Sequence, residues 1–373
     1  MKKNLNIAIL GGGLAGLTAA IHLKKAGCSV LIFEKENYPK HKVCGEYLSN
    51  EILPYWKNLG IEPFNWGALE ISKLQFTTSE GKNINAQLPL GGFGISRYTL
   101  DSKMAEIAKG AGCRFVFKTV EFVDFHKTFK VRTQDHTEYH ADLVIGSFGK
   151  RANLDISLSR KFIKHRSPWL GVKMHYNANI PNHTVQLHNF EGGYCGISRV
   201  EDHRVNLCYL THLDAFKKWG NLKNFQDQVL SQNPYLKSFF AEATPLFEKP
   251  LTISQVSFQQ KNVVENHILM CGDSAGLIHP LCGNGMAMAV VGSKILSECI
   301  IEYGKCGQNQ HQLEMNYSKK WNAEFTSRLR MGRVLQRILL NETATDYALK
   351  ALRKFPFMMH KLITSTHGKP VSL

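Results

Sequence analysis

The sequence predicts an α/β fold that contains a parallel sheet with a mixed sheet inserted into it. Near the N-terminus an apolar run at residues 7–10 leads through a triple glycine into an alanine- and leucine-rich segment at residues 14–26. A second apolar run follows at residues 29–33, and the order of apolar run, glycine turn and apolar segment recurs at residues 267–296. Short apolar runs of this kind, placed between turns and helices, are typical of parallel strands buried on both faces.

Composition sets limits on the class of protein. With 373 residues, of which 43% are hydrophobic, the chain can bury a large core. The 46 basic and 30 acidic residues leave a net charge of +16, which suits nucleic acid, an anionic membrane surface, or an acidic ligand or carrier protein. Because no nucleic-acid-binding motif accompanies this charge, we expect no nucleic-acid partner and a solvated basic surface that recruits anionic ligands.

Cysteine usage and hydropathy indicate the compartment. The nine cysteines include no C-x-x-C pair, so we predict neither a disulfide framework nor a metal site. No apolar stretch approaches the length of a membrane-spanning helix. We therefore expect a cytoplasmic protein that is at most peripheral to a membrane.

The first strand–turn–helix unit carries a dinucleotide-binding motif, because residues 11–16 read G-G-G-L-A-G and match G-x-G-x-x-G. We expect Gly11 to permit the tight turn, Gly13 to admit a pyrophosphate, and Gly16 to let helix and strand pack closely. Glu34 ends the second strand, where an acid accepts hydrogen bonds from a ribose and disfavours a 2′-phosphate. This Rossmann-like unit therefore predicts FAD or NAD rather than NADP. The neighbouring residues that we assign to the same site are Leu14, Ala15 and Lys35.

A second glycine-rich segment favours FAD. Residues 272–286 resemble the G-D-x-A…P-x-x-G-x-G element of the flavoprotein superfamily of aromatic hydroxylases, geranylgeranyl reductases and flavin-dependent halogenases. The resemblance implies that an aspartate holds the ribityl chain and that the turn faces the pyrimidine edge, where N–H donors stabilise a reduced flavin. An ordinary turn capped by the aspartate is the alternative, which the N-terminal unit disfavours. The residues assigned here are Asp273, Pro280, Gly283, Asn284, Gly285 and Met286.

Three further segments carry the resemblance. After the strand at residues 141–146 the family has an Asp-Gly pair, but Phe148 stands in place of the aspartate and only Gly149 keeps the turn. Residues 42–49 resemble the K-x-C-G-x-x-L-S segment of the geranylgeranyl reductase branch, which implies that Cys44 and Gly45 lie beside the flavin. Arg97 falls in a stretch similar to the family's R-x-x-L-D and is expected to contact FAD; a surface arginine is the alternative.

Two residues are candidates for catalysis. A thiolate at Cys44 would tune the flavin or take part in proton transfer, whereas the alternative is a packed free cysteine. Tyr194 lies in strand-like residues 169–210, where archaeal geranylgeranyl reductases carry Y-x-W-x-F-P; only the tyrosine matches, so an isoprenoid substrate does not carry over. For Tyr194, and for His175 in the same segment, a core residue is the alternative to a pocket residue.

The resemblance divides the chain into three parts. We expect a discontinuous FAD-binding domain at residues 1–70, 93–160 and 261–300, and a substrate domain at residues 71–92 and 161–260. Residues 301–373 form a helical region that includes a basic amphipathic helix. We expect that helix to cover the pocket; the alternative is contact with an anionic membrane or an acidic carrier protein.

These features predict an FAD-dependent reductase or dehydrogenase that acts on an apolar organic substrate, such as a lipid, isoprenoid or polyketide-like intermediate. A monooxygenase is the first alternative, and a non-catalytic electron-transfer or sensor protein is the second. The absence of W-x-W-x-I-P counts against a tryptophan-type halogenase. No second G-x-G-x-x-G unit is present, so NAD(P)H is expected only as a transient electron donor.

Overall fold

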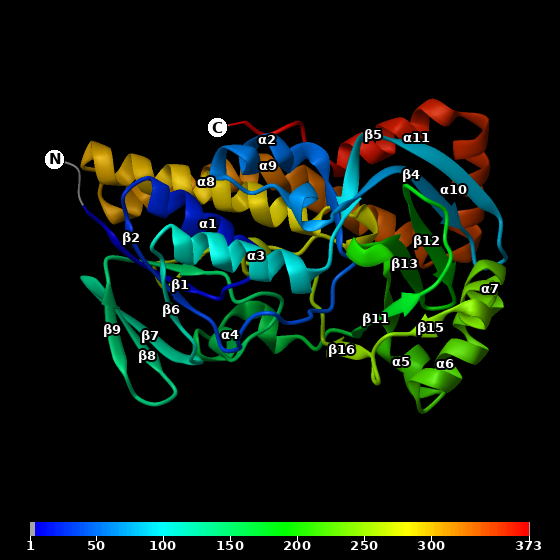
Figure 1. Ribbon diagram of the computed structural model, residues 1–373, viewed down its shortest axis with the longest axis horizontal. Helices are drawn as coiled ribbons and strands as arrows, with labels where there is room; N and C mark the ends of the chain where they lie inside the picture. Colours follow the sequence, from blue (N-terminus) through cyan, green and yellow to red (C-terminus); the bar gives the residue numbers. More distant parts are fainter. Residues whose placement is uncertain (1–3, 373) are drawn as a thin grey trace.

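A computed structural model describes residues 4–372, and it places two large sheets next to each other along the long axis of the molecule (Figure 1). The first has six strands in the order β17-β18-β10-β1-β2-β6, and every neighbouring pair is parallel except β17 with β18. The strands are β1 (Asn6–Leu10), β2 (Ser29–Phe33), β6 (Arg114–Val116), β10 (Leu143–Gly146), β17 (Val264–Glu265) and β18 (Ile268–Met270). The predicted Rossmann-like α/β fold is confirmed.

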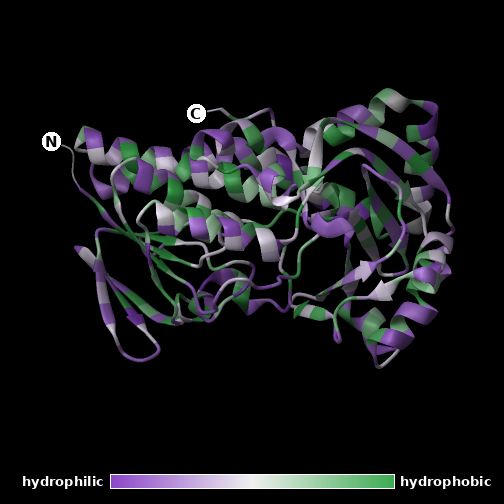
Figure 2. Cartoon of the chain, in the orientation of Figure 1, coloured by the Kyte–Doolittle hydropathy of each residue, from purple (hydrophilic) through white to green (hydrophobic). Residues whose placement is uncertain are grey.

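Helices cover one face of this sheet. They are α1 (Leu14–Lys25), α3 (Arg97–Gly110) and α8 (Gly285–Cys306), and α1 packs against both others. Because α1 is rich in alanine and leucine, it is buried on nearly all sides. Figure 2 shows the hydrophobic residues gathered on the strands beneath it. A three-stranded antiparallel sheet of β7 (Val120–His126), β8 (Thr128–Thr133) and β9 (Glu138–Ala141) contributes to the same core.

The second sheet has nine strands, eight of them in the order β15-β11-β14-β13-β12-β4-β5-β3, with β16 paired to β11. It confirms the mixed sheet expected from the alternation at residues 169–210, because β12 and β4 pair in parallel while the other pairs are antiparallel. Its strands are β3 (Tyr47–Ser49), β4 (Leu69–Thr77), β5 (Asn83–Gly94), β11 (Trp169–Asn177), β12 (Thr184–Phe190), β13 (Gly193–Arg199), β14 (Val205–His212), β15 (Thr244–Pro245) and β16 (Leu251–Ser254).

The remaining helices lie around both sheets (Figure 1). They are α2 (Leu53–Leu59), α4 (Asn153–Ser157), α5 (Leu213–Lys217), α6 (Leu222–Gln228), α7 (Pro234–Glu242), α9 (Gln310–Leu339), α10 (Glu342–Lys354) and α11 (Pro356–Thr366). Helix α9 packs on α8, and α10 and α11 continue from it so that α11 lies against β5 (Figure 1). Within residues 4–372 no helix combines the length and apolarity needed to cross a membrane.

The domain boundaries stay a prediction. The strands of the second sheet come chiefly from the two stretches assigned to the substrate domain, as Figure 1 shows. Strand β3, from the stretch assigned to the first domain, pairs with β5, so that Leu48 lies opposite Phe93. Residues 42–46, immediately before β3, therefore run from one sheet to the other.

Candidate functional site

A single continuous cavity of about 990 Å³ runs from the first sheet to the second. One end lies at the carboxyl ends of β1, β2 and β10, and its lining includes Gly11, Glu34 and Ser147. This is the edge at which open parallel sheets bind nucleotides. The other end is apolar and lies beneath the second sheet and the C-terminal helices.

The polar end is built around the N-terminus of α1. Gly11 has φ +110°, and a Cβ there would lie 2.4 Å from the carbonyl oxygen of Ser147, so only glycine fits this turn. Gly13, the N-cap of α1, offers no side chain to the helix, and no acidic residue stands in the first turn. The first N–H groups of α1 are thus left for a phosphate to bind.

Two cations face this helix end. A Cβ on Gly13 would come within 3.5 Å of Lys42 Nζ and 3.6 Å of Arg97 Nη2, so glycine keeps open the space between the turn and these two groups. Asp101, which is fully buried, accepts two hydrogen bonds of 2.7 Å from Arg97 and pairs with Lys42 at 3.0 Å. Burial acts to raise the pKa of Asp101, but the two cations outweigh it and hold the pKa below its ordinary value.

Glu34 lies where the sequence predicts a ribose-binding acid. Its Oε2 accepts a hydrogen bond of 3.1 Å from Gly12 N, and its Oε1 pairs with Lys40 Nζ at 2.6 Å. The carboxylate is buried and lines the cavity beside the glycine turn. An acid, a helix N-terminus and two cations thus line the same end of the cavity, and this donor and acceptor set fits a dinucleotide.

The loops after β10 and β18 are tied to each other at the middle of the cavity. Gly149 N donates to Ser274 Oγ at 3.0 Å, and Ser274 Oγ donates back to the carbonyl oxygen of Gly149 at 3.2 Å. Lys261 Nζ binds the carbonyl oxygens of Lys150 and Asp273 at 3.0 and 2.8 Å. These bonds fix the two loops, although Phe148 stands where the superfamily that the sequence resembles has an aspartate.

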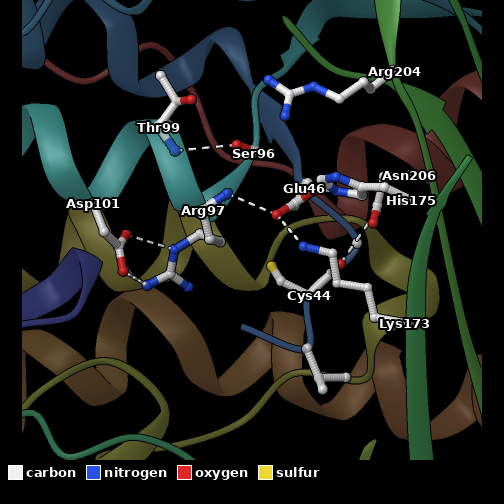
Figure 3. Close-up of polar contacts among 12 residues, drawn as sticks. Cys44, Glu46, Ser96, Arg97, Thr99, Asp101, Lys173, His175, Arg204 and Asn206 are labelled. Atoms are coloured by element: carbon white, nitrogen blue, oxygen red, sulfur yellow. Dashed lines mark hydrogen bonds and ion pairs between the residues drawn. The ribbon is translucent and has the colours of Figure 1, made fainter. Parts of the chain in front are cut away.

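A buried charge cluster lies under the segment before β3. Glu46 accepts hydrogen bonds from Arg97 N at 2.7 Å, from His175 Nε2 at 2.7 Å, and from Lys173 Nζ (Figure 3). Glu46, Lys173 and His175 have no exposed side-chain surface. Burial acts to raise the pKa of Glu46, but Lys173 and His175 outweigh it and lower the pKa, so Glu46 is a carboxylate.

The cluster holds an unusual backbone. Glu46 has φ +54°, a left-handed conformation that costs a non-glycine residue about 1–3 kcal/mol. On its N-terminal side, the carbonyl oxygen of Cys44 accepts a bond of 3.2 Å from Asn206 Nδ2. Polar contacts from the second sheet thus position the segment that contains Cys44 and Gly45, both of which line the cavity.

The two catalytic candidates both line the cavity, and the structure gives them different surroundings. Cys44 is half-buried and unbridged. Tyr194 is almost fully buried, and burial raises its pKa well above the ordinary value, so its hydroxyl stays protonated. His175, which the sequence offered as a second pocket residue in the same segment, bonds to Glu46 in the core, in keeping with the alternative of a core residue.

The apolar end forms a chamber. Two sides come from the second sheet and from the turn after β18, and the third comes from α9, α10 and α11. This arrangement supports the covering role that the sequence suggested for the C-terminal helices. Its lining includes Leu74, Leu187, Leu210, Ile253, Leu277, Leu281, Leu335, Leu339, Leu349, Leu352, Met359, Leu362 and Ile363.

Most of the residues assigned from the sequence line this cavity, although they come from seven separate stretches of the chain. They are Gly11, Gly13, Leu14, Ala15, Glu34, Lys35, Cys44, Gly45, Arg97, Gly149, Tyr194, Asp273, Pro280, Gly283, Gly285 and Met286. Gly16 and Asn284 lie behind the lining. A Cβ on Gly16 would meet the carbonyl oxygen of Gly11 at 2.1 Å, and Asn284 Nδ2 donates to the carbonyl oxygen of Thr366 at 2.8 Å.

The sequence alone did not single out the partners of these residues. Lys42 and Glu46 lie within the K-x-C-G-x-x-L-S segment, which was the one available signal for them. Lys173 lies among apolar neighbours in β11, as a structural strand residue would. Lys261 carried no signal, yet it is almost fully buried, and burial lowers its pKa to about 8.

Comparison with protein families supports the nucleotide-binding end. Residues 9–45 match the model of an NAD(P)-binding Rossmann-like domain, and this stretch contains the glycine turn and Glu34. Dinucleotide-binding units of this kind share these parts whichever dinucleotide they bind.

Several relatives align with most of the chain. Digeranylgeranylglycerophospholipid reductase 2 of Methanopyrus kandleri is 24% identical, over 86% of this chain and 83% of its own. Kynurenine 3-monooxygenase of Flavobacterium johnsoniae is 23% identical, over 88% and 80%. The predicted superfamily resemblance is confirmed. Conditioned medium factor receptor 1 of Dictyostelium discoideum is also similar, with 24% identity over 90% of this chain and 70% of its own.

Solved structures share the fold. The flavin-dependent brominase Bmp2 superposes with a TM-score of 0.81 and 16% identity, over 98% of this chain and 93% of its own. CmlS, a flavin-dependent halogenase, has a TM-score of 0.78 and 16% identity, over 89% of this chain and 64% of its own. At such identities the likeness establishes the architecture of the two sheets and the C-terminal helices.

Proposed function

We propose that the chain is an FAD-dependent oxidoreductase that transfers hydride to or from an apolar organic substrate. The observation that carries the proposal is the cavity itself, since one continuous space joins a dinucleotide-binding end to an apolar chamber. Such a space suits a cofactor and a substrate bound end to end.

In this proposal the chain's own groups bind and orient the cofactor. The N-terminus of α1, Lys42 and Arg97 bind the pyrophosphate, and Glu34 accepts from the adenosine ribose. Asp273 and the N-terminus of α8, which lacks a side-chain cap, serve the flavin half. Bound FAD supplies two-electron chemistry in the form of hydride transfer.

The second half of the proposal concerns the substrate. The chamber excludes water around the reacting carbon, because leucine, isoleucine and methionine side chains form most of its lining. The buried Tyr194 hydroxyl, which stays protonated, can donate a hydrogen bond to a substrate in the chamber. Cys44 also lines the cavity and is the group available for proton transfer.

A monooxygenase remains the second candidate because a kynurenine 3-monooxygenase is among the relatives. The two functions differ in the fate of oxygen. The FAD-loaded protein is reduced without air and then mixed with geranylgeraniol, a long-chain enone or a naphthoquinone. A reductase oxidises its flavin at the expense of one of these compounds in the absence of oxygen. A monooxygenase instead places the label of ¹⁸O₂ in the product, and that result would replace our proposal.

A further inference from the structure

The end of α10 and the start of α11 expose a cluster of large apolar side chains to solvent. We define this corner by Tyr347, Lys350, Lys354, Phe355, Phe357 and Met358. Tyr347 and Phe357 are 68% and 67% exposed, and Phe355 and Met358 are 43% and 40% exposed. The rings of Phe355 and Phe357 lie 6.1 Å apart, so the apolar surface is contiguous there. An exposed patch of this kind marks an interaction site.

The corner is also basic. Lys350 Nζ lies 5.6 Å from the ring of Tyr347, and Lys354 Nζ lies 5.7 Å from that of Phe355. Arg353 and Lys361 add two more cations, and no acidic residue follows Asp346 in the sequence. Lysines beside aromatic rings suit an interface between water, anionic headgroups and hydrocarbon.

We propose that this corner docks on an anionic lipid membrane, with Phe355, Phe357 and Met358 in the headgroup–acyl boundary and the cations on lipid phosphates. A helix corner of this composition inserts only a short way into the interface. A second copy of the chain fits less well, because two copies meeting here would bring their cations together.

The corner also borders the apolar chamber. Met358 lines the cavity as well as being exposed, and Met359 and Ile363, on the buried side of α11, line it too. Docking would therefore bring the chamber wall to the bilayer surface. That consequence rests on the proposed function, since it assumes an apolar substrate; the docking itself does not.

Vesicle sedimentation tests the proposal with the FAD-loaded chain of 373 residues. Vesicles of phosphatidylcholine alone and of phosphatidylcholine with phosphatidylglycerol serve as the two probes. We expect binding to the mixed vesicles that falls as salt is added. Phe357→Ser is expected to lower the partition coefficient onto the mixed vesicles about tenfold, because it withdraws one phenyl ring from the interface. Phe357→Trp is expected to keep the partition coefficient of the parent. Phe122→Ser, at a ring 40% exposed on β7, is the matched control and is expected to bind as the parent does.

A charge-matched pair separates a local site from the overall charge of +16. Lys350→Glu with Lys354→Glu should abolish the preference for anionic vesicles, whereas Lys218→Glu with Lys223→Glu, two exposed lysines outside the corner, should leave it unchanged. Equal losses from both pairs, or full binding by Phe357→Ser, would overturn the proposal. The proposal would also be overturned if the parent chain did not bind vesicles but dimerised through Phe357, or if it bound only an acidic protein. Vesicle binding without hydride transfer would contradict the proposed function alone.

Discussion

His175 Nε2 donates a hydrogen bond of 2.7 Å to Glu46 Oε2, and neither side chain has any exposed surface. This bond joins β11 of the second sheet to the segment that lines the middle of the cavity. Lys173 and the first amide of α3 bind the same carboxylate (Figure 3). Glu46 therefore serves to position Cys44 and Gly45.

Removing the charge of Glu46 should cost stability. Glu46→Gln leaves Lys173 buried without its counter-ion, and breaking a buried pair in this way costs about 3–5 kcal/mol. The free energy of unfolding in urea measures the loss. Adding Lys173→Met should recover much of it, because no unpaired charge then remains. A single Glu46→Gln variant as stable as the parent would show that the cluster contributes nothing to the fold.

The same cluster has a predictable pH dependence. The pKa of Glu46 is lowered in the folded protein from its ordinary value of 4.5, so the unfolded state binds the proton more readily. Its contribution is therefore fully present above pH 4.5 and is lost as the pH falls through the lowered pKa. Stability curves of the parent and of Glu46→Gln should converge in acid. Curves that stay parallel down to acidic pH would contradict this assignment.

Substitution by alanine should have different effects at the two glycines of one turn, Gly11 and Gly13. At Gly13 the backbone is extended and a Cβ meets only ordinary contacts, so Gly13→Ala should fold normally. It should nevertheless weaken FAD binding at least about tenfold, roughly 1.4 kcal/mol, by filling the space between α1 and the two cations. Gly11→Ala should instead destabilise the fold, because φ is +110°. Thermal unfolding and flavin titration together distinguish the two effects. Equal FAD affinity in Gly13→Ala and the parent would refute the binding of FAD between the N-terminus of α1 and the two cations.

The apolar chamber can be filled from α9. Leu335 lines the cavity, whereas its neighbour Val334 is 47% exposed. Leu335→Trp should reduce the binding of the apolar dye anilinonaphthalene sulfonate to the FAD-loaded protein about tenfold, and Val334→Trp should not. Flavin affinity should be the same in both. Dye binding that is indifferent to Leu335→Trp would place the chamber elsewhere.

His279 should make the protein sensitive to mild acid. It lies among Trp169, Tyr194 and Phe258, 3% exposed and with neither ring nitrogen bonded within the described chain. Burial lowers its pKa from 6.5 to about 3, so the unfolded state alone takes up a proton between these values. The stability that comes from holding His279 neutral in the folded protein is therefore complete above pH 6.5, and it is lost as the pH falls below that value.

His279→Phe removes the titrating group from that apolar setting. The free energy of unfolding of the variant, relative to that of the parent, should be about 2 kcal/mol higher at pH 5 than at pH 8. The reason is that the histidine of the unfolded parent takes up a proton at pH 5. Urea unfolding at the two pH values measures the difference. A gain of the same size at both values would mean that His279 does not titrate on unfolding.

The sequence predicted the elements that follow local rules. The apolar runs before Gly11 and before Gly272 became β1 and β18 because buried parallel strands need little more than such runs and turns. The basic amphipathic helix expected within residues 301–373 begins at Gln310, where Asn309 caps it through a capping box with Gln312. The strands at residues 169–210 were predicted, but their parallel pairing to β4 was not, because it joins residues more than a hundred positions apart.

The residues of the candidate site also fall into those that a local motif predicts and those that only long-range contacts bring to the site. Gly11, Gly13, Glu34 and Asp273 belong to motifs whose spacing carries the chemistry, so the sequence predicts them as site residues, and all four line the cavity. Lys173 and Lys261 act through long-range contacts to Glu46 and to the loop of Asp273, and no local pattern encodes such contacts.

Titration of FAD into the purified chain, followed by absorbance and calorimetry, tests the central claim most directly. We expect retained or added FAD to bind with a stoichiometry of about one per chain and to displace the hydration of the polar end without unfolding the protein. The melting temperature should rise with FAD concentration. A chain that is purified without flavin, binds no added FAD and melts at the same temperature with and without it would contradict the account.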